Sequence, residues 1–345
     1  MTTTAPAKPA VDKIWYTRCP VPTASGLAHN LGWLSDAFAA RGLQVGVLQE
    51  APPEIARHHF DHRLLGLFRE GGNVPALVAR SEGAPTRLIG LTWIDEGQAV
   101  LTRPDTGIAS PADLAGRRIA VPAWADTRAK SFPRAMALHG FRGALALAGL
   151  TLDDVEHVEV PPTLSGRLEP DSPAPTWPGL AELAAGTVDA VYVKGARAAE
   201  EAAAIGATVA VDLDAVPDRR HRVNNGTPRP ITVHERILDE RPELVTDFLV
   251  QTLRAADWAA TDPDGVRRIL AAETHSGAEG VARAYADGFH TGLHPDLSDE
   301  RLDLLAAQED FLHRHGFLAE RVDVRAWAVH EPLAAAREAL ARATP

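Results

Sequence analysis

The sequence predicts an α/β protein with two lobes. Its 345 residues exceed the roughly 250–300 at which a single hydrophobic core stops growing. Hydrophobic residues make up 45% and charged residues 23% of the chain, which is typical of globular proteins. Residues 13–48 follow the order strand, loop, helix, strand, and this βαβ order requires parallel pairing of the two strands.

The first elements can be assigned from their patterns. Residues 13–17 alternate as a strand does, and the prolines in the Cys-Pro-Val-Pro segment at 19–22 end that strand because proline removes ladder donors. Apolar residues at helical spacing predict one amphipathic helix over residues 25–40, followed by a strand at 44–48. Cys19 therefore lies in a βα loop. In open parallel sheets, ligands bind beyond the carboxyl ends of the strands.

The middle of the chain begins with a polar segment at 51–70, which contains three histidines and leads into a Gly-Gly pair. That pair permits positive φ and exposes amides to an approaching anion. Periodicity and turn residues then predict further helices and strands. They cover 74–80 (helix), 86–93 and 98–102 (strands), 132–148 (helix), 156–160 (strand), 180–185 (helix), 188–192 (strand), and helices at 241–258 and 299–313.

We expect discontinuous domains. A tail at 1–12 precedes a first lobe made of 13–121 plus 231–345, and the second lobe covers 122–230. From residue 231 onward we expect a helical return to the first lobe. The proline-rich stretch 161–178 is either a lid over the cleft or a plain surface loop.

Composition excludes several classes of protein. The net charge of −11 and pI near 5.7 give no electrostatic footprint for nucleic acid or anionic membrane. The sequence has no run of 18 or more apolar residues, so it predicts no membrane span. The segment before Cys19 lacks the apolar block of a signal peptide, which argues against lipid attachment there. With a single cysteine, a reduced cytoplasmic setting is expected. We also expect a monomer.

Cys19 is the first candidate for chemistry. A thiol reacts when histidine, arginine or oriented amides tune its pKa, and all three follow within residues 58–72. A lone cysteine is, however, more often a small buried hydrophobe.

The neighbouring candidates have ordinary alternatives as well. His58 and His62 have i, i+4 spacing but no carboxylate in a metal-binding pattern, so a solvated turn is favoured and no metal site is expected. Arg69 by itself fits a surface residue, and Gly71-Gly72 by itself fits a simple turn.

A family resemblance changes this balance. The segment Tyr-Thr-Arg-Cys-Pro-Val-Pro at 16–22 resembles the nucleophile region of the 2'-hydroxybiphenyl-2-sulfinate desulfinase family, which has Tyr-Ser-Asn-Cys-Pro-Val-Pro. That family continues with His-Phe and, ten residues after the histidine, Arg-Phe-Gly-Gly. This chain has His59-Phe60 and Arg-Glu-Gly-Gly at 69–72 with the same spacing.

The segment at 110–121 similarly resembles the entry to the second lobe in type II periplasmic-binding-protein folds of the nitrate, sulfonate and taurine group. The resemblance thus implies a two-lobed type II periplasmic-binding-protein-like fold with a central cleft.

The resemblance also implies roles for individual residues. Cys19 would be the catalytic thiol, His59 its hydrogen-bonding partner, and Arg69 with the Gly72 amide the clamp for the sulfinate. A planar guanidinium suits an anion with two oxygens. The other substrate-binding candidates are Thr17, Phe60, Gly71, Trp124 and Phe132, with Trp177 as a further aromatic. Arg18 and Glu70 depart from the family, which has asparagine and an aromatic residue there.

The implied reaction is hydrolysis of an aryl carbon–sulfur bond without a cofactor, releasing sulfite from 2'-hydroxybiphenyl-2-sulfinate or a related aryl sulfinate. Two mechanisms fit: thiolate attack on sulfur, or protonation of the ring carbon by the thiol with water attack on sulfur. The alternatives are a non-catalytic solute-binding protein or sensor for a sulfonate-like anion, and a related cleft enzyme with another substrate.

Overall fold

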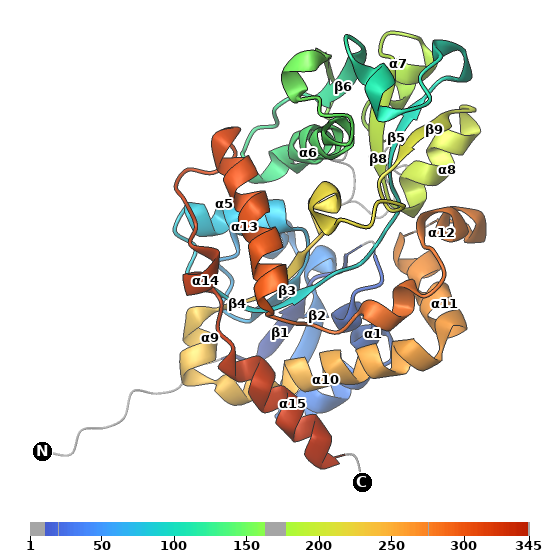
Figure 1. Ribbon diagram of the computed structural model, residues 1–345. Coiled ribbons are helices and arrows are strands. Elements are labelled where there is room, and N and C mark those ends of the chain that lie inside the picture. Colours follow the sequence, from blue (N-terminus) through green and yellow to red (C-terminus); the bar gives the residue numbers. More distant parts are fainter. Residues whose placement is uncertain (1–10, 20, 163–176, 275, 344–345) are drawn as a thin grey trace, which may run out of the picture.

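The protein has two lobes, each built around a five-stranded sheet (Figure 1). The computed structural model describes residues 11–19, 21–162, 177–274 and 276–343. None of the helices in these ranges combines the length and the apolar character needed to cross a membrane.

The first sheet has the order β2-β1-β3-β10-β4. Its first three strands in this order are parallel, and β10 runs antiparallel to both β3 and β4. Tyr16 at the end of β1 is in register with Val47 on β2 and Phe68 on β3. The carboxyl ends of β1 and β3 therefore lie at one edge, where β10 begins. The strands are β1 Lys13–Tyr16, β2 Gln44–Val47, β3 Leu67–Glu70, β4 Thr86–Thr92 and β10 Arg229–His234.

The second sheet has the order β7-β6-β8-β5-β9. Strand β6 is parallel to β7 and β8, whereas β5 is antiparallel to β8 and β9. The strands are β5 Gln98–Thr102, β6 Arg118–Pro122, β7 Glu156–Val160, β8 Ala190–Lys194 and β9 Thr208–Asp212.

Two segments connect the sheets, one at 93–97 between β4 and β5 and the other at 213–228 between β9 and β10. We call them the hinge segments. The expected entry into the second lobe at residue 122 is wrong. Strands β5 and β6 lie before that residue, and each of them pairs with β8 in the second sheet. The expected return near residue 230 coincides with β10.

Helices cover both sheets (Figure 1). Those of the second lobe are α6 Phe132–Ala146, α7 Leu180–Ala184 and α8 Ala196–Ala204. The others are α1 Ala24–Asn30, α2 Trp33–Ala39, α3 Pro53–Ala56, α4 His58–Asp61, α5 Asn73–Ser81, α9 Glu235–Glu240, α10 Pro242–Thr261, α11 Pro263–Thr274, α12 Ala278–Ala284, α13 Asp299–Arg314, α14 Val324–Trp327 and α15 Glu331–Ala343. Short 3₁₀ turns are found at Leu48–Glu50, Pro104–Thr106, Pro111–Leu114, Ala129–Ser131, Leu152–Asp154, Arg219–Arg222 and Phe289–Gly292.

Three expected elements differ from the structure. The single helix over 25–40 is two helices, because Gly32 adopts φ 79° between α1 and α2. The polar segment at 51–70 ends in the buried strand β3, and the chain from residue 231 forms β10 before it becomes helical. Most of the proline-rich loop, residues 163–176, lies outside the described residues, so its role as a lid stays a prediction.

Helix α6 packs tightly on β8, and one glycine makes this contact possible. A Cβ atom at Gly140 would lie 2.2 Å from the ring of Tyr192, which is buried and fixed by a hydrogen bond from its hydroxyl to Gln98. We expect Gly140→Ala to destabilise the protein, since overpacking costs about 1–3 kcal/mol against a helix-propensity gain of at most about 1 kcal/mol. Thermal unfolding measures the effect. Gly292→Ala is the matched control, because nothing lies within 4 Å of its added Cβ, and an equal loss in both variants would contradict the packing argument.

Candidate functional site

Cys19 follows β1 at the edge where β1, β3 and β10 meet. The chain leaves β1 through Thr17, which is 1% exposed and donates a hydrogen bond from Oγ1 to the Glu70 carbonyl oxygen at 3.4 Å. This bond ties the end of β1 to the end of β3. The side chain of Cys19 is partly exposed and packs against the main core. The parallel register thus brings Cys19 and residues 69–72 to one place.

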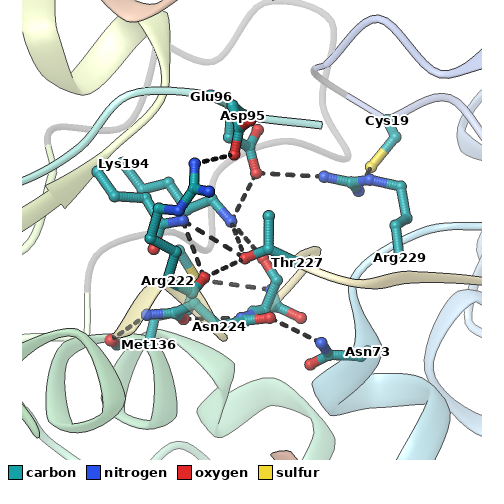
Figure 2. Close-up of polar contacts among 12 residues, drawn as sticks. Cys19, Asn73, Asp95, Glu96, Met136, Lys194, Arg222, Asn224, Thr227 and Arg229 are labelled. Carbon is teal, nitrogen blue, oxygen red and sulfur yellow. Dashed lines mark hydrogen bonds and ion pairs between the residues drawn. The ribbon is translucent and has the colours of Figure 1, made fainter. Parts of the chain in front are cut away.

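Arg229, the first residue of β10, contacts the thiol directly. Its Nη1 donates a hydrogen bond to Cys19 Sγ at 2.9 Å (Figure 2), and only 3% of the residue is exposed. The sequence analysis missed this residue. It lies 210 positions from Cys19, and no local motif marks it.

The charges around Cys19 act in opposite directions on its pKa. Burial raises the pKa of the thiol above its ordinary value, and this effect is the largest. The guanidinium groups of Arg229 and Arg69 lower it, while the carboxylates of Glu96 and Glu70 raise it again. The net pKa is raised, so the protonated thiol predominates at neutral pH.

Arg69 lies on β3 and is 1% exposed. Its Nη1 donates a hydrogen bond to the Gly72 carbonyl at 3.0 Å, whereas its buried Nε has no partner among the described residues. Burial lowers the pKa of Arg69 to about 10, so the side chain remains charged at neutral pH. Arg69 is thus a buried cation with an unused donor, and it is close enough to the thiol to lower its pKa.

The glycine pair provides space rather than unusual backbone angles. Neither residue has positive φ, so the expected conformational role is wrong. A Cβ atom on Gly71 would lie 2.7 Å from Arg69 Cζ, and one on Gly72 would lie 2.3 Å from Asn225 Oδ1. The Gly71 amide donates to the Pro230 carbonyl within the sheet. The Gly72 amide has no acceptor among the described residues, which leaves it available to a ligand.

His59 lies in α4 and is close enough to Arg69 for the guanidinium charge to lower its pKa. Burial lowers the pKa of His59 to about 3, with a further contribution from Arg69. The ring packs edge-on against Phe60 at 4.9 Å, and its buried Nδ1 has no partner among the described residues. Among the described residues, His59 and Cys19 are not joined by a hydrogen bond. The contact that was expected from His59 is made by Arg229 instead.

The other two histidines of this segment have separate environments. His58 Nδ1 lies 2.6 Å from Asp61 Oδ1. His62 ends α4 with φ 54°, and both of its buried ring nitrogens lack partners among the described residues. Within the described ranges, no three histidine, cysteine or acidic side chains are grouped as a metal site requires.

A buried ion cluster lies behind Arg229, and we call Glu96, Lys194 and Arg229 the hinge cluster. Glu96 Oε1 accepts from Arg229 Nη2 at 3.2 Å and from Lys194 Nζ at 2.8 Å (Figure 2). Lys194 Nζ also donates to the Asn225 carbonyl at 2.9 Å and to Thr227 Oγ1 at 3.3 Å. Lys194 ends β8 of the second lobe, so its contacts join that lobe to both hinge segments.

A hollow of about 430 Å³ lies at strands β1 and β2 of the first sheet. It is lined by side chains of β1 and β2 together with Arg18 and His29, and none of the predicted site residues lines it. Arg18, which replaces the family's asparagine, points toward Glu50 at 2.8 Å and Glu273 at 3.3 Å rather than toward the thiol.

Comparison with known proteins identifies the family. The chain is 30% identical over 350 residues to the 2'-hydroxybiphenyl-2-sulfinate desulfinase of Rhodococcus erythropolis, and this covers 93% of the chain and 92% of the relative. The same protein name and identity are found in Rhodococcus qingshengii. The chain belongs to the 2'-hydroxybiphenyl-2-sulfinate desulfinase family. An NMT1/THI5-like family model also matches residues 27–165.

Solved structures agree with this family. The crystal structure of desulfurization enzyme DSZB matches with a TM-score of 0.75 at 28% identity, covering 95% of this chain and 99% of that one. A cysteine-to-serine mutant of DSZB in complex with biphenyl-2-sulfinic acid matches with a TM-score of 0.76 at 27% identity, with the same coverage. The periplasmic aliphatic sulphonate binding protein SsuA from Escherichia coli shares the fold, with a TM-score of 0.65 at 15% identity over 93% of this chain and 92% of that one. The predicted family and fold class are confirmed.

Glu70 departs from the aromatic residue of the desulfinase family and has a structural role. It is fully buried. One carboxylate oxygen accepts from the Ser25 amide at 3.0 Å and from Ser25 Oγ at 2.6 Å, and the other accepts from Thr92 Oγ1 at 2.8 Å. It therefore holds α1 and β4 against the end of β3.

The three candidate aromatics make other contacts. Trp124 is 45% exposed, and its ring lies 4.5 Å from that of Phe317 and 5.5 Å from the Arg134 guanidinium. Phe132 begins α6 and packs partly against the main core. Trp177 Nε1 donates to the Tyr192 carbonyl at 2.7 Å. The structure brings together Thr17, Cys19, Arg69, Gly71 and Gly72. His59 is close enough to Arg69 to be affected by its charge, and Phe60 packs against His59. The contacts of the three aromatics do not place them in this group.

The depressed pKa of His59 gives a measurable expectation. The folded pKa of about 3 lies below the ordinary value of about 6.5, so the folded protein binds fewer protons at this ring than the unfolded chain does. Its contribution to stability is present above about pH 6.5 and is lost as the pH falls below that value. We expect the His59 ring nitrogens to remain neutral by NMR down to about pH 5, with the signal assigned from His59→Gln. Protonation near pH 6.5 would contradict the burial of this ring.

Proposed function

We propose that this chain hydrolyses an aryl sulfinate, 2'-hydroxybiphenyl-2-sulfinate or a close relative, and releases sulfite. The observation that carries this proposal is the convergence of two buried arginines on the single cysteine, one from β3 and one from β10. The family relative carries the corresponding name and aligns with 93% of the chain.

The sulfinate would bind where donors are unused. Arg69 Nε and the Gly72 amide both lack partners among the described residues, and both belong to the short segment after β3. A guanidinium and a backbone amide together can donate to the two oxygens of a sulfinate. These are the residues that the family resemblance assigns to the clamp.

The reaction adds water across the carbon–sulfur bond. The hydrogen goes to the ring carbon, the hydroxyl goes to sulfur, and sulfite leaves. The thiol either gives its proton to the carbon or, as a thiolate, attacks sulfur. The raised pKa of Cys19 favours the protonated thiol in the unliganded site, so a proton is available where the first route needs it. His59 would act on the attacking water and accept the proton that this water loses.

A second candidate function is binding without turnover. It is favoured by the fold shared with the sulphonate-binding protein. Isothermal titration with sulfonates and sulfinates, combined with a sulfite assay, separates the two: tight binding without sulfite selects the binding protein. The cytoplasmic location and the monomeric state stay predictions.

The first test removes the thiol. We expect Cys19→Ser to abolish sulfite release from 2'-hydroxybiphenyl-2-sulfinate, because a hydroxyl has a much higher pKa than a thiol and is a poorer acid and nucleophile. A colorimetric sulfite assay measures the rate, and circular dichroism checks the fold. Full activity in the serine variant would exclude both thiol mechanisms.

The second test moves Arg69 without removing it. A Cβ atom on Gly71 would meet the guanidinium carbon at 2.7 Å, and because the far end of a flexible side chain can shift, the protein should stay folded. We expect Gly71→Ala to raise the KM for the sulfinate about tenfold, the range of a lost charge-assisted hydrogen bond, and Arg69→Ala to raise it at least as much. An unchanged KM in both variants would remove Arg69 from the clamp.

A further inference from the structure

We propose that Arg229 is a catalytic residue of this site, which holds the sulfur of Cys19 and sets the fraction of thiolate. Its role in turnover rests on the proposed function, whereas its contact with the thiol does not. Neither the segment around Cys19 nor the clamp residues indicate this arginine.

The geometry gives the contact one direction. Arginine carries donors only and stays protonated in proteins, so at 2.9 Å the sulfur must be the acceptor. A thiolate is a far better acceptor than a thiol, and the contact therefore stabilises the charged form. Arg229 binds the sulfur through Nη1 and Glu96 through Nη2. The two terminal nitrogens of the planar guanidinium thus bind two different partners, and this fixes the orientation of the group.

The surroundings show why this charge can exist inside the protein. Arg229 is 3% exposed, and a buried guanidinium needs a counterion. Glu96 supplies it and is itself held by Lys194 at 2.8 Å. The chain of contacts runs from Cys19 through Arg229 and Glu96 to Lys194, that is, from the first lobe to the second.

Other charged and titratable groups also face Cys19. Arg69 on β3 lowers its pKa, Glu96 and Glu70 raise it, and the phenols of Tyr16 and Tyr285 are close enough to interact with it. His59 has a pKa of about 3 and is neutral at working pH. Arg229 is therefore the only one of these groups that combines a permanent positive charge with a direct hydrogen bond to the sulfur.

The experiment measures the thiol in the ligand-free protein. Because Cys19 is the single cysteine, the rate of alkylation by iodoacetamide against pH reports the pKa of this one group. A neighbouring opposite charge shifts a pKa by about 1–3 units, so we expect Arg229→Gln to raise the apparent pKa by at least about one unit. At pH values below both pKa values, alkylation should slow about tenfold. The variant should fold, since Glu96 keeps Lys194 as its partner.

Two further variants sharpen the test. Arg229→Lys keeps the charge but cannot bind the sulfur and Glu96 through one fork, so we expect a smaller shift in the same direction, and this variant decides the question if the glutamine variant does not fold. Arg222→Gln is the matched control. Arg222 is a buried arginine of the hinge segment at 213–228, and it pairs with Asp95 at 2.9 Å rather than with the thiol. We expect its alkylation profile to stay unchanged.

The outcomes separate this inference from the proposed function. With the desulfinase substrate, Arg229→Gln should lower kcat more than it raises KM, the reverse of Arg69→Ala. An unchanged thiol profile in a folded Arg229→Gln variant, or an equal shift in Arg222→Gln, overturns the role of Arg229. If the native protein releases no sulfite while the profile shifts as expected, the proposed function fails and the assignment of Arg229 as the partner of the thiol stands.

Discussion

The structure depends on one buried carboxylate, Glu96. One of its oxygens binds two cations. Arg229 and Lys194 approach it at 3.2 and 2.8 Å, and all three side chains are almost fully buried. Removing one member of a buried ion pair costs about 3–5 kcal/mol because the partner is left uncompensated, and here two partners would be left. The relative position of β8 and β10, the orientation of Arg229 and the environment of the thiol all follow from this cluster.

Glu70 is the other buried carboxylate that affects the thiol, and it has a different structural role. Three hydrogen bonds from Ser25 and Thr92 hold its carboxylate, so its charge is compensated by donors and not by a cation. Arg69, the preceding residue, forms no ion pair with Glu70 among the described residues, so its charge stays available to an anion. The two buried carboxylates near Cys19 differ in this way: Glu96 organises cations, whereas Glu70 organises backbone elements.

The local parts of the site could be predicted from the sequence, and the distant parts could not. The position of Cys19 in a βα loop follows from prolines and a strand pattern within ten residues, and Arg69 follows from a motif at fixed spacing. Arg229 approaches only because β10 inserts antiparallel between β3 and β4, a pairing that no local pattern reveals. The space-making role of Gly71 likewise depends on a side chain, Arg69, whose direction only packing decides.

The hinge cluster couples the arrangement of the lobes to the chemistry of the thiol. In this structure Glu96 shares its charge between Lys194 and Arg229, and Nη1 of Arg229 donates to the sulfur. A movement that withdrew Lys194 would leave Glu96 with Arg229 as its sole counterion, and the stronger attraction would draw the guanidinium toward the carboxylate. The sulfur would then lose its donor, and its pKa would rise, because Arg69 would be the remaining guanidinium that lowers it. A movement that breaks the hinge cluster would therefore also change the state of the thiol.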